Sequence, residues 1–209
     1  MSKILVTGGL GFIGSNFISK IIDKENFIVN IDSETYASID NAFLNFKSSQ
    51  NYKQYRIDIS DFQKVNDIIN KYSFDIIFHF AAESHVDNSI NSSFEFCTTN
   101  VLGTLNLLES YSRLNKKNKL FIHISTDEVF GSINKGFFDE NSNYNPNSPY
   151  SASKASSDHF VRAYFETHNL PAIITNCSNN FGPFQNKEKF IPTIINSLIN
   201  RKSIPIYGD

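Results

Sequence analysis

Two stretches of the chain carry side chains whose types and spacing could perform acid and base chemistry. The first is Tyr150-Ser151-Ala152-Ser153-Lys154, where a phenol and an ammonium group four residues apart would share one face of a helix. A cation held beside Tyr150 lowers the pKa of the phenol from its ordinary value of about 10, which would let the phenol act as a base near neutral pH. The spacing alone is weakly specific, since about 0.6 such matches arise by chance in this composition, and a solvated helix face is the alternative.

The second stretch is Ser125-Thr126-Asp127-Glu128, which completes an apolar run expected to be a strand. Ligands of open α/β sheets bind at the carboxyl ends of the strands, so these side chains are well placed for a site. Two adjacent carboxyl groups can take opposite roles, one protonated and one ionised, when their environments differ. The alternative is a polar strand end at which Asp127 caps the next turn.

A glycine-rich loop, Gly8-Gly9-Leu10-Gly11-Phe12-Ile13-Gly14, joins the first expected strand to the first expected helix. Glycines let a backbone approach a pyrophosphate closely, and the helix N-terminus supplies N–H groups and a positive dipole end. The chain has only 9 glycines, so about 0.02 matches to this pattern are expected by chance. We therefore predict a dinucleotide-binding turn, with an ordinary tight turn as the alternative.

Asp32 ends the second expected strand, 18 residues after Gly14. A carboxylate at that position can accept hydrogen bonds from ribose hydroxyls and would repel a 2′-phosphate. The position therefore predicts NAD rather than NADP. Glu34 lies nearby and favours the same cofactor. The alternative is that Glu34 is a solvated surface charge.

Six short β-type runs alternate with helix-length segments, which is typical of a parallel sheet covered by helices on both faces. The predicted strands are residues 3–7, 27–32, 53–59, 75–81, 120–125 and 172–176. Ser60 with Gln63 has the pattern of a capping box, and Ser148 with Pro149 begins a helix that runs to about His168. A polar loop over residues 131–148 is long enough to be a lid, and a further helix is expected at about 190–200. The predicted fold class is α/β, a Rossmann-type doubly wound parallel sheet.

Composition and charge exclude several kinds of partner. Charged residues make up 19% of the chain and the net charge is −2, which argues against binding to nucleic acid. No apolar run approaches the roughly 18 residues that span a bilayer, and Met1 leads directly into a strand. We expect a cytoplasmic protein with neither a signal peptide nor a membrane partner.

The histidines give no sign of a metal site. His79 and His123 lie inside apolar strands, and none of the 5 histidines has the spacing of a metal ligand, so no metal is expected. Ser84 and His85 lack the nucleophile elbow of a hydrolase.

These residues resemble a known family closely: the extended short-chain dehydrogenases/reductases and, among them, the dTDP-glucose 4,6-dehydratases. Asp127-Glu128 after Thr126 is the most specific feature, because related epimerases and decarboxylases usually carry small residues there. The matching stretches span the whole chain in register: Val6-Thr7-Gly8-Gly9 through Gly14, Ala81-Ala82-Glu83-Ser84-His85-Val86-Asp87, Ser125-Thr126-Asp127-Glu128-Val129, Ser148-Pro149-Tyr150 through His159, Thr175-Asn176-Cys177-Ser178-Asn179-Asn180, and Pro205-Ile206-Tyr207-Gly208.

The resemblance implies a lyase that dehydrates dTDP-glucose to dTDP-4-keto-6-deoxyglucose in deoxysugar biosynthesis of the rhamnose type, with NAD regenerated in every turnover. Tyr150, assisted by Thr126 and Lys154, would take the proton from O-4 of the sugar while a hydride leaves C-4 for NAD. Glu128 would then remove the C-5 proton and Asp127 would protonate the departing C-6 hydroxyl, after which the hydride returns to C-6. The implied catalytic residues are Thr126, Asp127, Glu128, Tyr150 and Lys154.

The resemblance also assigns residues to the two ligands and implies a homodimer through helices that start near Thr98 and Pro149. The residues implied for the cofactor are Gly8, Gly11, Phe12, Ile13, Gly14, Asp32, Ser33, Glu34, Thr35, Asp58, Ile59, Phe80, Ala81, Ala82, Glu83, Ser84, Thr99, Tyr150, Lys154 and Asn180. Those implied for the nucleotide sugar are Ser84, Thr126, Asn179, Lys189, Phe190, Ile191, Pro192, Thr193, Ile194, Pro205, Ile206 and Tyr207.

The chain departs from the family pattern in sequence and in length. Asn88 replaces the usual arginine and Ser33-Glu34 replace the common Lys-Leu, so a local charge contact and the fit to adenosine would differ.

Family members continue well beyond the Pro-Ile-Tyr-Gly motif. We therefore expect residues 1–178 to form an NAD-binding Rossmann domain without its last strand, and residues 179–209 to begin a smaller, truncated substrate-binding region. The chain alone is expected to bind sugar nucleotide weakly and to turn it over negligibly. The alternatives are an NAD-dependent sugar-nucleotide epimerase or decarboxylase, and an inactive NAD-binding fragment.

Overall fold

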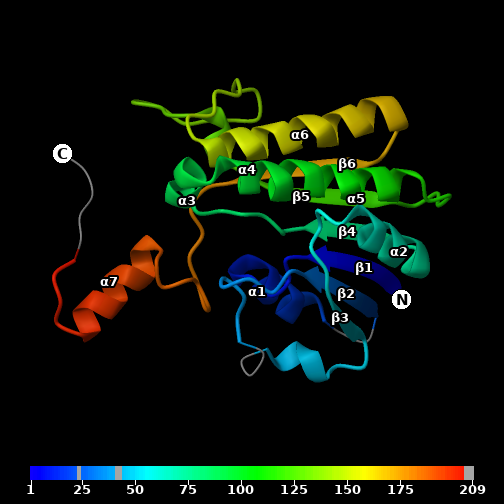
Figure 1. Cartoon of the computed structure of the whole chain (residues 1–209), viewed down its shortest axis with the longest axis horizontal. Helices are drawn as coiled ribbons and strands as arrows, with labels where there is room; N and C mark the ends of the chain where they lie inside the picture. The colour runs from blue at the N-terminus through cyan, green and yellow to red at the C-terminus, as the bar shows by residue number, and fades with distance from the viewer. Residues whose placement is uncertain (23–24, 41–43, 205–209) are drawn as a thin grey trace.

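A six-stranded parallel sheet forms the centre of the fold, with the strand order β3-β2-β1-β4-β5-β6 (Figure 1). The structure is a computed structural model and describes residues 1–22, 25–40 and 44–204. The strands are β1 (Ser2–Thr7), β2 (Asn26–Asp32), β3 (Tyr52–Arg56), β4 (Ile76–His79), β5 (Leu120–Thr126) and β6 (Ala172–Cys177). All six predicted strands are present and the Rossmann-type doubly wound sheet is confirmed. The order reverses between β1 and β4, so the loops after these two strands diverge and leave a crevice between them.

Helices cover both faces of this sheet. The helices are α1 (Phe12–Ile21), α2 (Phe62–Tyr72), α3 (Val86–Asn91), α4 (Ser93–Phe96), α5 (Gly103–Ser112), α6 (Pro149–His168) and α7 (Phe190–Ile199), with short 3₁₀ turns η2 (Asn45–Ser48) and η4 (Asp127–Phe130) and a π-helical segment η3 (Cys97–Leu102). Helices α2, α5 and α6 pack side by side on one face, while α1 and η2 lie on the other. The predicted helix after β6 is confirmed as α7, which lies away from the sheet (Figure 1).

Alternate residues of the strands supply two separate apolar clusters. Leu5 of β1 packs in one cluster with Val65 of α2 and Leu107 of α5. Its neighbours Ile4 and Val6 point to the opposite face and pack with Ile18 of α1. The central strands β1 and β2 therefore contain continuous apolar runs, because both faces of the sheet are buried at its centre.

The two helix starts predicted from the sequence have different outcomes. Ser148 caps α6 as expected: its side chain accepts from the backbone N–H of Ser151, and the Ser151 hydroxyl in turn pairs with the backbone of Ser148, with Pro149 as the first helical residue. The capping box predicted at Ser60 is wrong. Asp61 is the N-cap of α2, and its carboxylate accepts from the backbone N–H of Lys64 at 3.2 Å. An ionised carboxylate at the end of a helix dipole is the better acceptor of the two side chains.

The loop between η4 and α6 is held at its base. The backbone N–H of Asn145 donates to the carbonyl oxygen of Val129 at 2.9 Å, and Phe130 packs against Phe138 and Tyr144. The role of this loop as a lid stays a prediction. Among the described residues, no helix is long and apolar enough to cross a membrane.

Candidate functional site

The glycine loop between β1 and α1 passes directly over the end of β4. Gly8 has a φ of +71°, and a Cβ atom placed on it would lie 2.6 Å from the backbone nitrogen of Ala81. A Cβ atom on Gly14 would lie 2.3 Å from the carbonyl oxygen of Gly8. Only glycine fits at these two positions, because the first needs a left-handed backbone and both face backbone atoms within contact distance. The N-cap of α1, Gly11, has no side chain that could occupy the helix end, so the loop has the form that receives a phosphate.

A cleft of about 440 Å³ opens beside this loop. Its lining includes many of the residues implied for the cofactor. Those are Gly8, Gly11, Asp32, Ser33, Glu34, Thr35, Asp58, Ile59, Phe80, Ala81, Ala82, Glu83 and Thr99. Six further lining residues were missed from the sequence: Ile31, Ala37, Ser38, Arg56, Ile57 and Glu95. Of the others implied for the cofactor, Phe12, Ile13, Gly14, Ser84, Tyr150, Lys154 and Asn180 do not line this cleft.

The cleft is rich in carboxylates, and Asp32 is the most constrained of them. Its two oxygens accept from the backbone N–H groups of Leu10 and Glu34, both at 2.9 Å, and from the Ser38 hydroxyl at 3.3 Å. Asp32 therefore ties the phosphate loop to the loop that follows β2. Burial, reinforced by Glu95 and Asp58, raises the pKa of Glu83. The negative charge of these carboxylates suits a dinucleotide whose ribose carries no 2′-phosphate.

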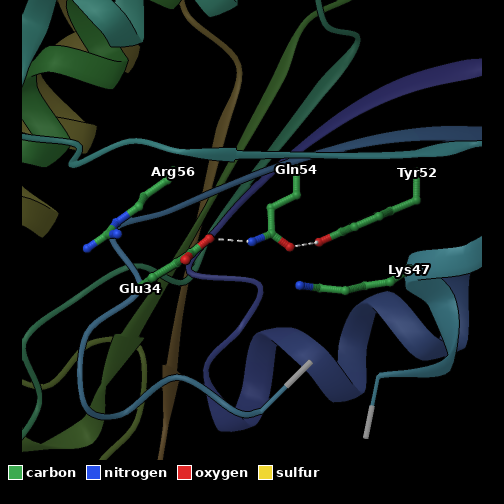
Figure 2. A pocket seen from close by; sticks show the side chains of 5 residues that line it. All are labelled: Glu34, Lys47, Tyr52, Gln54 and Arg56. Carbon is green, nitrogen blue, oxygen red and sulfur yellow. Dashed lines mark hydrogen bonds between the residues drawn. The ribbon is translucent and has the colours of Figure 1, made fainter. Parts of the chain in front are cut away.

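A second, smaller pocket of about 280 Å³ adjoins the cleft at the edge of the sheet, and Glu34 and Arg56 line both. Figure 2 shows that the Glu34 carboxylate accepts a hydrogen bond from Gln54 at 2.6 Å and that Gln54 accepts one from the Tyr52 hydroxyl at 3.3 Å. Lys47 completes the lining. Glu34 is therefore held in a defined position at the rim of the cleft and is not a freely solvated charge.

The Tyr150 and Lys154 side chains are both buried in the first turns of α6. Lys154 is 3% exposed, and its ammonium group donates to the carbonyl oxygen of Ile124 at 2.8 Å. Burial lowers the pKa of Lys154 to about 8. Burial and then the charge of Glu128 raise the pKa of Tyr150 above its ordinary value, and the Thr126 hydroxyl opposes them. The predicted lowering of the phenol pKa by Lys154 is thus wrong for this structure, because Lys154 bonds to the strand and does not offset the burial of Tyr150.

The Asp127 and Glu128 side chains begin η4 directly after β5. The Thr126 hydroxyl oxygen accepts from the backbone N–H of Glu128 at 3.2 Å and caps this turn. Thr126 is the cap, so the alternative in which Asp127 caps the turn is wrong. Burial and the charge of Asp127 raise the pKa of Glu128, while Lys189 acts against them. A carboxyl group with a raised pKa beside a second carboxyl group is the arrangement expected where protons are exchanged.

Some of the residues implied for the nucleotide sugar converge on this site. Lys189, the N-cap residue of α7, reaches within 3.5 Å of the Ser84 carbonyl oxygen. Asn16 of α1 donates to the Pro183 carbonyl oxygen at 2.9 Å, which brings the loop after β6 beside the glycine loop. The side chains of Phe190 and Ile191 are exposed. Pro205, Ile206 and Tyr207 lie outside the described residues.

Two buried residues that support the site were missed from the sequence. Asn100, in the π-helical segment η3, bonds to both backbone groups of Glu83 and donates to the Ser153 hydroxyl at 2.8 Å. No pattern in the sequence marks a π-helical turn, although such turns are frequent at functional sites. The second is Asp158, which lies one helical turn beyond Lys154. The four-residue spacing between Lys154 and Asp158 could have identified Asp158 as a partner on the same helix face.

A parallel sheet in this order, a glycine loop at its reversal point, and a Tyr-x-x-x-Lys pair in the first turns of α6 define a Rossmann domain of the short-chain dehydrogenase/reductase class. The chain belongs to the GDP-mannose 4,6 dehydratase family, whose family model matches residues 5–209.

Individual relatives support the same assignment. The chain is 46% identical over 219 residues to a dTDP-glucose 4,6-dehydratase of Haemophilus influenzae, with 100% of the chain and 65% of the relative covered. A dTDP-glucose 4,6-dehydratase of Streptomyces venezuelae, solved with NAD and TYD bound, superposes with a TM-score of 0.92 at 40% identity, over 99% of this chain and 65% of the other. A UDP-glucose 4-epimerase of Thermotoga maritima superposes with a TM-score of 0.89 at 26% identity, over 99% of this chain and 66% of the other. The chain thus spans about two thirds of the length of these relatives.

Replacing Gly8 by alanine should destabilise the protein strongly. We expect a loss of about 3 kcal/mol in the free energy of unfolding, because the methyl group adds a backbone overlap to the strain of a positive φ. Gly136 is a matched control: its φ is +97°, but a Cβ atom placed on it would have its nearest neighbour 3.7 Å away, so Gly136→Ala should cost about 1 kcal/mol. Urea unfolding measures both, and equal losses would contradict the close approach to β4.

Proposed function

We propose that these residues carry out the NAD-dependent dehydration of dTDP-glucose to dTDP-4-keto-6-deoxyglucose in deoxysugar biosynthesis. The observation that carries the proposal is the carboxyl pair Asp127 and Glu128, set on η4 beside the buried Tyr150. The names of the similar Haemophilus and Streptomyces proteins support the same reaction and substrate. Since the chain spans about two thirds of those relatives, the activity, the substrate and the partners of the whole protein are proposed here.

The cofactor that fits the cleft is NAD. The glycine loop would hold its pyrophosphate, and Asp32 and Glu34 line the part of the cleft suited to a ribose without a phosphate. When bound, NAD would accept a hydride from C-4 of the sugar and return it to C-6. NAD in the solved Streptomyces and Bacillus anthracis relatives supports this choice.

The first task of the protein side chains is to remove the proton from O-4 of the sugar. Tyr150 lies within hydrogen-bond reach of Thr126, so a sugar hydroxyl between them would meet a donor and an acceptor. A Tyr150 phenolate would have a high proton affinity because burial raises the pKa of the phenol. The Lys154 ammonium group, one helical turn away, is the cation that would stabilise it.

The second task is elimination across C-5 and C-6. Glu128 would remove the C-5 proton, and its raised pKa makes the ionised form a stronger base than an exposed glutamate. Asp127, directly beside it on η4, would give a proton to the departing C-6 hydroxyl. An epimerase needs no such carboxyl pair, so Asp127 and Glu128 argue against the epimerase and decarboxylase alternatives, although the fold is shared with an epimerase.

We also propose a division of the chain at about residue 178, with residues 1–178 binding NAD and residues 179–209 beginning the substrate-binding region. The end of β6 at Cys177 and the position of α7 away from the sheet support this division (Figure 1). The assignment of the individual ligand-contacting residues given above is part of the proposal. A cytoplasmic location stays a prediction.

A homodimer is the proposed assembly. Large apolar side chains are exposed on neighbouring helices, with Phe94 of α4 83% exposed and Phe165 of α6 50% exposed. Ile90 of α3 and Phe160 of α6 add to the same helical surface, and α3 and α4 both pack against α6. Burying such side chains against a second copy would contribute about 25 cal/mol per Å².

Cofactor choice is the first test. NAD should bind at least about tenfold more tightly than NADP, which corresponds to about 1.4 kcal/mol, because the 2′-phosphate would meet Asp32 and Glu34. Asp32→Ala should reduce this preference, whereas Asp67→Ala, which removes an exposed carboxylate of α2, should leave it unchanged. Calorimetric titration with both cofactors measures the ratio, and equal affinities in the unaltered protein would contradict the assignment.

The second test asks whether Tyr150 and Glu128 remove different protons from the sugar. In the full-length enzyme, Glu128→Gln should slow C-5 proton exchange by about 10²- to 10⁴-fold while C-4 oxidation persists, because the amide keeps the shape but cannot accept a proton. Tyr150→Phe should instead block oxidation. Because a base must be ionised and the Glu128 pKa is raised, exchange should increase with pH through a pKa above the ordinary value of about 4.3.

The measurements for this second test are solvent deuterium incorporation at C-5 and NADH absorbance on mixing with dTDP-glucose. If the Glu128→Gln protein exchanged deuterium at the unaltered rate, the base would have to be another residue.

The proposed dimer interface is tested by placing a charged side chain in it. Phe94→Glu should shift the protein from dimer to monomer in sedimentation velocity, because a carboxylate cannot be buried in an apolar contact without a large cost. Phe137→Glu, which alters an 86% exposed side chain in the loop before α6, is the control and should leave the dimer intact. A monomer in the unaltered protein, or a dimer that persists in Phe94→Glu, would exclude this interface.

A further inference from the structure

Three polar side chains follow one another along the buried face of α6. Tyr150, Lys154 and Asp158 are spaced four residues apart, so each lies about one turn, or about 6 Å along the helix axis, from the next. All three are buried, and Asp158 is only 1% exposed. The proton transfers described above use the first two and leave Asp158 without a role.

Four groups around Asp158 favour its ionised carboxylate, although burial outweighs them and the pKa of Asp158 is raised overall. Its Oδ2 atom accepts hydrogen bonds from the Ser125 hydroxyl at 2.8 Å and the Tyr144 hydroxyl at 3.0 Å, and it lies 3.5 Å from the Asn176 amide nitrogen. Burial raises the pKa of Asp158, but Lys154 and these three donors act in the opposite direction. A carboxylate that accepts several hydrogen bonds keeps its charge even when buried.

No other charged group in the described part of the chain is placed to balance Lys154 in the same way. His123 of β5 approaches Asp158 with Nε2 at 3.2 Å from Oδ1, yet neither atom makes a hydrogen bond of good geometry. Burial holds the pKa of His123, and of His79 on β4, well below the ordinary value, and Lys154 lowers both further, so both rings are neutral. On β6, Cys177 is the other titratable group that acts on Lys154, and its effect ranks below that of Asp158.

We propose that Asp158 is a positioning residue that keeps the Lys154 ammonium group charged and directed at the end of β5, as the site requires. An isolated lysine in a buried site loses its proton because the interior solvates the charge poorly. The carboxylate one turn away supplies the opposite charge, while Ser125, Tyr144 and Asn176 hold that carboxylate in place. The Lys154 ammonium group then remains charged at the end of β5, and Lys154 lies one helical turn from Tyr150.

The catalytic meaning of this pair rests on the proposed function, because the charge of Lys154 matters to the sugar only if Tyr150 takes its proton. The charge itself can be measured without substrate or cofactor. With a Lys154 pKa of about 8, the group is mostly protonated at pH 7, and a fall of about one unit would leave about half of it uncharged.

The test is a pH titration of the protein labelled with ¹³C at the lysine ε-carbons, followed by NMR, with Lys154→Arg used to assign the signal. The Lys154 signal should titrate near pH 8 in the unaltered protein and at least about one unit lower in Asp158→Asn. Tyr144→Phe is the matched control: it removes a hydrogen bond to Asp158 but no charge, and should shift the Lys154 pKa by less than about 0.3 units.

A reciprocal variant covers the case in which Asp158→Asn does not fold. In Lys154→Met, the side-chain carbon of Asp158 should titrate about one unit higher than in the unaltered protein, because the coupling between two charges acts equally on both. An unchanged Lys154 pKa in folded Asp158→Asn, an equal shift in Tyr144→Phe, or an unchanged Asp158 pKa in Lys154→Met would each overturn the proposal. A protein that shows the expected shifts but binds no NAD would contradict the proposed function and leave the charge pair intact.

Discussion

A neutral imidazole joins the two strands at which the sheet order reverses to the helix that covers them. Nδ1 of His79, on β4, lies 2.7 Å from the Thr7 hydroxyl on β1, and Nε2 lies 2.8 Å from the Thr104 hydroxyl on α5. The Thr104 hydroxyl donates to the Asn100 carbonyl oxygen, and the Thr7 hydroxyl accepts from the Ala81 N–H. These directions leave one consistent arrangement, in which Nε2 carries the proton and Nδ1 accepts. Protonation of the ring would break it, and burial accordingly holds the pKa of His79 far below its ordinary value.

This contact brings the parts of the cleft together. Thr7 precedes the glycine loop, Ala81 lies beneath Gly8, and Asn100 holds the backbone of Glu83. A shift between β1 and β4 would therefore change the phosphate loop, the loop after β4 and the π-helical segment at once. The crevice between two diverging loops is a property of the parallel sheet, but its dimensions depend on these hydrogen bonds.

The other half of the site is organised by polar groups that the sheet buries. Asp158 links β5, α6 and the loop before α6 through Ser125 and Tyr144. Leaving any of these groups without a partner would cost about 1 to 3 kcal/mol, so the network helps to specify a single arrangement of Tyr150 and Lys154. The same arrangement raises the pKa of the phenol, which makes the charge state of Lys154 the variable on which the chemistry depends.

The amino-acid sequence alone predicted the fold class and many of the residues that line the cleft. Apolar runs identify the central strands such as β2, because strands buried on both faces need few polar side chains. The glycine loop is recognisable because Gly8 has a positive φ and Gly14 lies against the backbone of Gly8. Ser148 caps α6 as expected, since a cap depends on near neighbours. Only the tertiary structure decided which groups share an environment. Arg56 and Glu95 line the cleft, and Lys154 turns toward Ile124. Each of these outcomes depends on burial and on residues distant in the chain, and burial changes the pKa of a group by more than any spacing in the sequence can indicate.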